Sequence, residues 1–199
     1  MDSYNIALFL HLVTVMLAGA ATAATKLAAG RCRAARTVGE VLEWHTMLMS
    51  AARLFPICLV IFVATGAYMA MIAHLDMWST AFVGAGLVGV ALLLISGTYL
   101  GVKAKGLKTV LEQVIAANGH DHPTPKVAPP RLVAILPSVN TYLAIAVMFV
   151  MVTKPATMTG ALGIIALGMI VGAASAMRHA APQNVRAGDA LQARSDEAA

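Results

Sequence analysis

A run of twenty uncharged residues, from 54 to 73, constrains the fold of this chain more than any other feature. A helix rises about 1.5 Å per residue, so the run is long enough to cross the hydrocarbon core of a bilayer, which is about 30 Å thick. Arg53 precedes the run, and His74, Asp76 and Trp78 follow it. Every other apolar segment has to pack around a membrane span of this kind.

The composition of the whole chain agrees with this assignment. Hydrophobic residues make up 59% of the 199 residues and charged residues only 12%, which is about half the charged share of soluble domains. The sequence therefore predicts an all-α integral membrane helical bundle, whose first partner is the lipid bilayer. The net charge of +5 indicates no nucleic-acid partner, because the basic residues lie in loops between apolar spans, where they determine topology.

Apolar runs divide the chain into five predicted membrane spans. They cover residues 4–28, 54–73, 80–102, 132–153 and 157–177. Together they form one transmembrane domain, residues 1–178. A polar, alanine-rich tail follows, residues 179–199, and we expect it to be disordered and cytoplasmic.

Two connectors between the spans are compatible with helix. Residues 38–50 form either a helix on the membrane surface or the first turns of a long second helix. Residues 103–117 end at Asn118-Gly119, which is typical of a helix C-cap. A proline-rich linker follows, and we expect its His120-Asp121-His122 segment to be a solvated turn.

The distribution of Lys and Arg predicts the orientation. Thirteen of the fourteen fall in three places, with five in residues 26–53, five in 103–131 and three from Arg178 onward. These are alternate segments outside the spans, so the positive-inside rule makes their side cytoplasmic and predicts an N-out, C-in protein. A signal peptide cleaved after Ala20 would leave four spans, but the segment before the first apolar run carries no Lys or Arg.

Small residues mark the faces along which the spans are expected to pack. Gly97 and Gly101 in the third span, and Gly168 and Gly172 in the fifth, have GxxxG spacing. Lipid tails are as apolar as leucine, so helices in a membrane associate through close packing. We expect these glycines to let helix backbones approach one another. Other membrane subunits or a second copy of the chain are the protein partners we expect.

His11 is the strongest candidate for a functional residue, because ionisable groups within apolar spans are costly and rare. It lies about two turns, or roughly 10 Å, from the outer end of the first span. A neutral imidazole there needs a hydrogen-bond partner or a metal. One interpretation is a bond to a neighbouring helix, for example to Thr65, Asn140 or Tyr142. The other is axial ligation of haem b, which a helical bundle can house between its spans.

A haem with two histidine ligands needs a second histidine at a similar depth. His74 lies on the same side of the membrane but nearer the surface, whereas His45 lies on the other side. Arg53, at the cytoplasmic end of the second span, either extends to the lipid headgroups or binds an anion such as a haem propionate. His11, Arg53 and His74 are therefore the candidate haem-binding residues.

Met71, His74 and Met77 suggest a second kind of site. They recur every three residues at the outer end of the second span, close to one helical face. Thioethers and imidazole are ligands that suit Cu(I), so a copper site is an alternative. Methionine also fills gaps between helices, and packing is the competing interpretation.

Patterns of catalytic residues are missing from the sequence. There is no HExxH, no GxSxG and no pair of carboxylates within a span. The sequence therefore favours a non-enzymatic membrane protein, such as an accessory subunit. A haem b redox protein and a copper-handling protein are the alternatives.

Two segments carry a resemblance to a known group of proteins. ALFLHLVTVMLAG and ARLFPICLVIFVATGAYMAMIAHLDMW resemble the first two spans of small bacterial membrane proteins of unknown function. These are distant relatives of the copper-resistance protein D family and of the haem-containing membrane protoporphyrinogen oxidase. The likeness covers roughly residues 5–105 and implies a helical bundle in the inner membrane. In the haem-binding relatives the first-span histidine is the axial ligand, which corresponds to His11.

Overall fold

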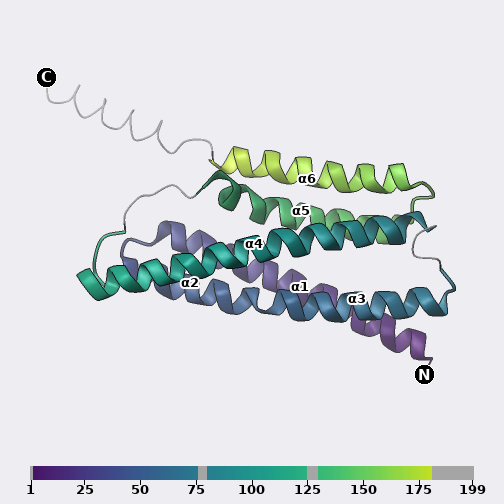
Figure 1. Ribbon diagram of the computed structural model, residues 1–199, viewed down its shortest axis with the longest axis horizontal. Helices are drawn as coiled ribbons and strands as arrows, with labels where there is room; N and C mark the ends of the chain where they lie inside the picture. The colour runs from purple at the N-terminus through teal and green to yellow at the C-terminus, as the bar shows by residue number, and fades with distance from the viewer. Residues whose placement is uncertain (1, 76–79, 125–129, 181–199) are drawn as a thin grey trace, which may run out of the picture.

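The computed structural model describes residues 2–75, 80–124 and 130–180, and this part of the chain is folded into helices (Figure 1). In order they are α1 (Ser3–Ala34), α2 (Val38–Ala52), α3 (Leu54–Ile72), α4 (Ala81–Asn118), α5 (Arg131–Thr153) and α6 (Met158–Ala180). Within the described ranges, five segments are long and apolar enough to cross a membrane, because α2 and α3 count as one. The predicted all-α bundle of five spans is confirmed.

The structure of the second span decides whether residues 38–50 form a separate surface helix or the first turns of a long second helix. α2 continues into α3 with a break at Arg53, and the two helices lie nearly in line in Figure 1. Pro56 follows the break, and its ring removes the N–H that would bond to Ala52 and crowds that carbonyl group. The interpretation of residues 38–50 as the first turns of a long second helix is therefore confirmed.

Three of the helical segments are much longer than the predicted spans. α1 continues to Ala34, the second segment begins at Val38, and α4 continues to Asn118. At about 1.5 Å per residue, α4 is roughly 57 Å long, nearly twice the thickness of the hydrocarbon core. The expected C-cap at Gly119 is present, with φ 85°. Residues 31–34, which follow the first predicted span, form the last turn of α1.

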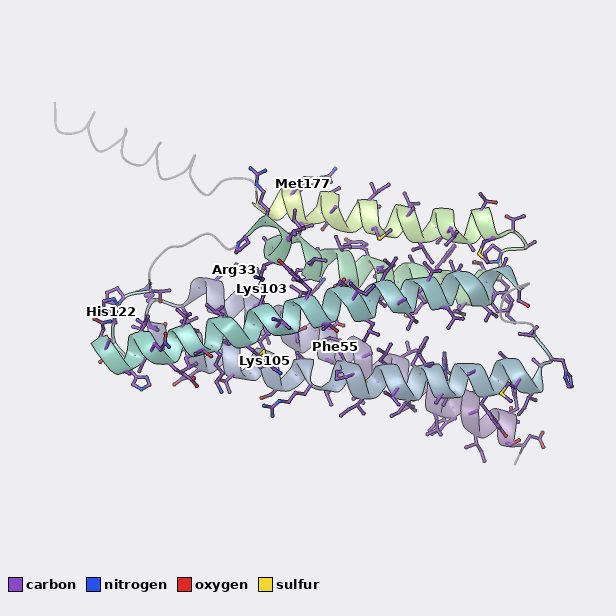
Figure 2. All side chains as sticks on the ribbon, viewed as in Figure 1. Arg33, Phe55, Lys103, Lys105, His122 and Met177 are labelled. Carbon is purple, nitrogen blue, oxygen red and sulfur yellow. The ribbon has the colours of Figure 1, made fainter. Side chains whose placement is uncertain are left out.

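The extra turns of these helices pack together at one end of the bundle, which we call the projecting end. Val38 and Val41 of α2 and Leu111 of α4 form a small buried core there. Lys103 and Lys105 of α4 and Arg33 of α1 lie in this half of the molecule (Figure 2). The positive charge that the sequence places in alternate connectors therefore gathers at one end of the fold.

The turn after α4 is bound to the start of α2. The N–H of Val38 donates to the carbonyl of His122 at 2.9 Å, and the N–H of Gly39 donates to the carbonyl of His120 at 3.1 Å. The Thr37 hydroxyl accepts from the N–H of Glu40 at 3.3 Å. These bonds satisfy the first amides of α2, which have no partner within the helix. The side chains of the turn are exposed, as expected, but its backbone holds two connectors together.

The helices form two groups, α1–α3 and α4–α6. The core of the second group is formed by buried residues of α4, α5 and α6: Ala85, Leu143, Val147, Val150, Ala161 and Ile165. α1 packs along α2 and α3, and the extended contact between the groups is that of α2 with α4. α3 has no extended contact with α4, α5 or α6 in the described residues, and in Figure 1 it lies on the opposite side of α4 from α5 and α6.

Buried small residues determine how α1 packs. Ala7, Thr14, Ala21 and Ala28 are its buried residues, and they are spaced seven apart. A seven-residue repeat keeps one narrow stripe of a helix against its neighbour. The stripe lets the long α1 helix run along α3 and then α2.

Candidate functional site

His11 lies on α1 and faces α3. Its Nδ1 is 2.9 Å from the hydroxyl oxygen of Thr65, and its ring stacks on Phe62 with 4.2 Å between the ring centroids. Gly66 borders the ring, and a Cβ at that position would lie 3.5 Å from the imidazole Cε1, an ordinary van der Waals distance. The predicted bond from His11 to a neighbouring helix is therefore present, and Thr65 is the partner.

The hydrogen bonds around Thr65 identify the tautomer of His11. The Thr65 hydroxyl donates its one hydrogen to the carbonyl of Ile61 at 2.7 Å. It must then accept from His11, so the proton of a neutral imidazole is on Nδ1 and the lone pair is on Nε2. Within the described part of the chain, no donor is hydrogen-bonded to Nε2. A lone pair held in this way can accept a hydrogen bond or bind a metal.

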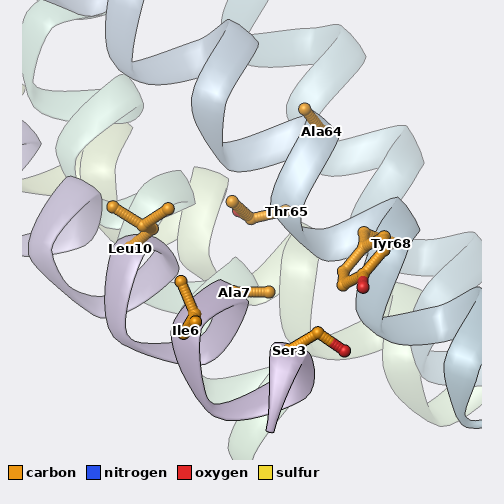
Figure 3. Close-up of a pocket in the computed structure, with 7 residues that line it drawn as sticks. All are labelled: Ser3, Ile6, Ala7, Leu10, Ala64, Thr65 and Tyr68. Atoms are coloured by element: carbon orange, nitrogen blue, oxygen red, sulfur yellow. The ribbon is translucent and has the colours of Figure 1, made fainter. Parts of the chain in front are cut away.

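A shallow apolar groove lies beside this contact, between α1 and α3 (Figure 3). Its volume is about 360 Å³, and it is lined by Ser3, Ile6, Ala7, Leu10, Ala64, Thr65 and Tyr68. Thr65 belongs both to the groove and to the bond with His11. The groove can therefore hold an apolar group close to the histidine.

The structure does not bring the three candidate haem residues together. Arg53 is exposed at the junction of α2 and α3, about 18 Å along the helix from Thr65 at 1.5 Å per residue. His74 is exposed beyond the other end of α3, about 13 Å from Thr65 by the same measure. Only His11 lies beside the groove.

The predicted copper ligands lie where α3 ends. The N–H of Leu75 donates to the carbonyl of Ala70 at 2.9 Å, and the N–H of His74 donates to that of Met71 at 3.1 Å. His74 has φ 50°, so it is the left-handed residue that closes a Schellman motif. The helical face on which the spacing argument was based therefore ends before His74. Met77 lies outside the described residues, and the copper site stays a prediction.

A metal site of another kind would need several His, Cys, Asp or Glu side chains close together in the same described ranges. No group of three or more His, Cys, Asp or Glu side chains there is placed to hold a metal ion.

Two polar contacts between helices were not predicted from the sequence. Buried His45 of α2 donates from Nε2 to the carbonyl of Ala104 in α4 at 2.9 Å. The side chains of Ser96 in α4 and Asn140 in α5 are hydrogen-bonded at 2.7 Å. A polar residue such as Asn140 stands out within an apolar span, so the sequence could have indicated this contact. A backbone partner such as the carbonyl of Ala104 cannot be recognised in a sequence, because every residue type has a carbonyl group.

Compared with known proteins, the chain matches no family model, no curated protein and no solved structure. The resemblance to relatives of the copper-resistance protein D family stays a hypothesis.

Proposed function

We propose that this chain is a non-enzymatic, multi-pass accessory subunit of a bacterial inner membrane. It binds a transmembrane helix of another subunit along the face of α4 that contains Gly97 and Gly101. The observation that supports this proposal most strongly is the empty space beside these two glycines. A Cβ at either position would have no atom of the described residues within 4 Å, apart from its own stretch of helix.

The position of the two glycines on α4 supports the same conclusion. Gly97 and Ala104 are seven residues apart, which is close to two helical turns, so they lie on the same face of α4. Ala104 is bonded to His45 of α2, and α3 continues in line from α2. The glycine face is therefore turned towards the side of α3, which is also the least covered span. Only 6% of the apolar window of the α2–α3 segment is buried, against 17–22% in the other spans.

Exposure of apolar side chains is ordinary in a membrane, so the glycines carry the argument. Glycine in a helix costs about 1 kcal/mol relative to alanine, and close packing of a neighbouring backbone is the usual compensation. Among the described residues, Gly97 and Gly101 have no such neighbour. A helix from another subunit supplies it.

Co-purification from native membranes in a mild detergent tests this proposal. We expect the wild-type protein to carry a stoichiometric membrane-protein partner, which Gly97→Leu loses. Gly163→Leu is the matched control, because Gly163 is also an exposed helical glycine with open space around it, but on α6. The proposal is wrong if all three proteins purify without a partner, or if the control loses the partner as well. A complex of twice the chain mass would identify the partner as a second copy.

The free lone pair of His11 favours a second candidate function, a haem b redox protein. His11 would hold the iron through Nε2, with Thr65 fixing the ring through Nδ1, and the apolar groove would take part of the porphyrin. When bound, the group supplies one-electron transfer. The resemblance to haem-binding membrane proteins supports the same assignment.

Absorption spectra of the purified protein, oxidised and then reduced with dithionite, test the haem candidate. A Soret band with sharp reduced α and β bands, lost in His11→Ala, is the expected result. Thr65→Val should weaken haem retention without abolishing it, because the ring loses its orienting bond and keeps Nε2. A featureless spectrum from folded protein produced with added haem would exclude this function.

A further inference from the structure

A second groove lies on the surface of the α5–α6 pair. Its volume is about 450 Å³, and it is lined by Tyr142, Val171, Ala174, Ser175 and Arg178. Four of these residues follow one face of α6, and Tyr142 of α5 forms the opposite wall. The groove is separate from His11 and from the glycine face of α4.

The polarity of the groove changes along its length. Val171 and Ala174 are apolar, Ser175 adds a hydroxyl group, and Arg178 adds a positive charge. At 1.5 Å per residue, Ser175 lies about 4.5 Å deeper than Arg178, and Val171 about 10 Å deeper. Acyl chain, glycerol ester and phosphate follow one another in the same order along a phospholipid.

Arg178 stands at the membrane boundary. It is the first charged residue of α6, which begins at Met158, and it follows Met177, which marks this end of the helix in Figure 2. No carboxylate of the described residues forms an ion pair with it. Arg131 begins α5 at the same end, because Gly172 of α6 packs against Val139 of α5 and the two helices are antiparallel.

We propose that this groove is a binding site for one anionic phospholipid. The guanidinium group of Arg178 binds the phosphate, which its planar fork of donors matches. The hydroxyl groups of Ser175 and Tyr142 face the ester region, and neither forms a hydrogen bond with another described side chain. One acyl chain lies over Ala174 and Val171. Basic pockets between transmembrane helices recognise lipid headgroups in this manner.

Lipid titration followed by native mass spectrometry tests the proposal on the full-length protein in detergent. The probes are phosphatidylglycerol and phosphatidylcholine with identical acyl chains. We expect the first phosphatidylglycerol to bind about fivefold more tightly, since one basic residue near a headgroup contributes about that factor. Arg178→Gln should remove the preference. Ala174→Leu, which fills the groove, should weaken the binding of both lipids.

Lys105→Gln is the matched control. It removes the same charge from an exposed position on α4, away from the α5–α6 groove. The proposal requires this variant to keep the preference for phosphatidylglycerol. An equal loss in Lys105→Gln, or equal binding of the two lipids to the wild type, would overturn it. Competition by millimolar inorganic phosphate would show that the site takes a free anion instead.

Discussion

Two glycine pairs with the same spacing have opposite surroundings in this protein. Gly168 and Gly172 of α6 lie against α5, where a Cβ would come within 2.7 Å of the Ala146 side chain and within 2.6 Å of the Val139 backbone. Gly97 and Gly101 of α4 have no atom from another part of the described chain within 4 Å of such a Cβ. A GxxxG motif therefore indicates that a close contact is favourable, and the fold determines whether the chain itself supplies it.

The difference follows from how much of each helix the chain covers. α6 has α5 beside it and forms part of the buried core of the second group. The glycine face of α4 is turned towards the side of α3, which packs on α1 and α2 instead. Of the two GxxxG pairs, the pair of α6 is therefore used for packing among the described residues, and the pair of α4 is not.

The largest effect is expected from adding a side chain at the Gly168/Gly172 pair, which packs closely against α5. Gly172→Leu would force a side chain against the backbone of Val139. A backbone cannot relieve such a clash by changing rotamer, as a side chain can. We expect a loss of about 3 kcal/mol in the free energy of unfolding, at the upper end for overpacking. Unfolding in mixed micelles of increasing SDS content measures this. If Gly172→Leu and Gly163→Leu unfold at the same SDS fraction, the close contact of α5 and α6 is not a source of stability.

A smaller effect is expected from loosening the link between the two groups. His45→Ala removes a buried bond from α2 to α4 and leaves a cavity, at a cost of about 2 kcal/mol. His122→Ala is its control, because His122 contributes its backbone carbonyl and exposes its side chain. The same SDS titration applies, and equal effects of the two substitutions would contradict the role given to His45.

The smallest effect is expected from adding a side chain at the Gly97/Gly101 pair, which has open space beside it. Gly97→Leu should not destabilise the isolated chain, because the new side chain meets open space, and the better helix propensity of leucine should add at most about 1 kcal/mol of stability. A thermal unfolding scan of the detergent-solubilised, partner-free chain measures this. A marked loss of stability would mean that α3 or α1 closes on α4 in the membrane, and the comparison of the two pairs would fail.

The parts of this fold that follow from local sequence could be predicted. Uncharged runs located the five spans, and Asn118-Gly119 located the end of α4, because both depend on residues close together in the chain. Thr65 was one of the three side chains given as examples of a partner for His11. The seam of small residues between α5 and α6 was also visible from its spacing.

The parts that depend on distant backbone could not be predicted. The amides of Val38 and Gly39 bond to carbonyls of the turn after α4, and any residue type can supply a carbonyl. His45 likewise bonds to the backbone of Ala104. The small core of Val38, Val41 and Leu111 lies among basic helical turns, so its apolar residues did not form a run that stands out from a solvated connector.

The projecting end has a mechanical consequence for the whole molecule. The extended contact between the two groups is that of α2 with α4, whose small core lies at this end, so the joint lies at one extremity of two long, stiff arms. With α3 about 28 Å long, a rotation of about 10° at the joint displaces the far end of that arm by roughly 5 Å. Such a lever amplifies small rearrangements outside the hydrocarbon core. A small rotation at this joint would therefore change the width of the space beside α4.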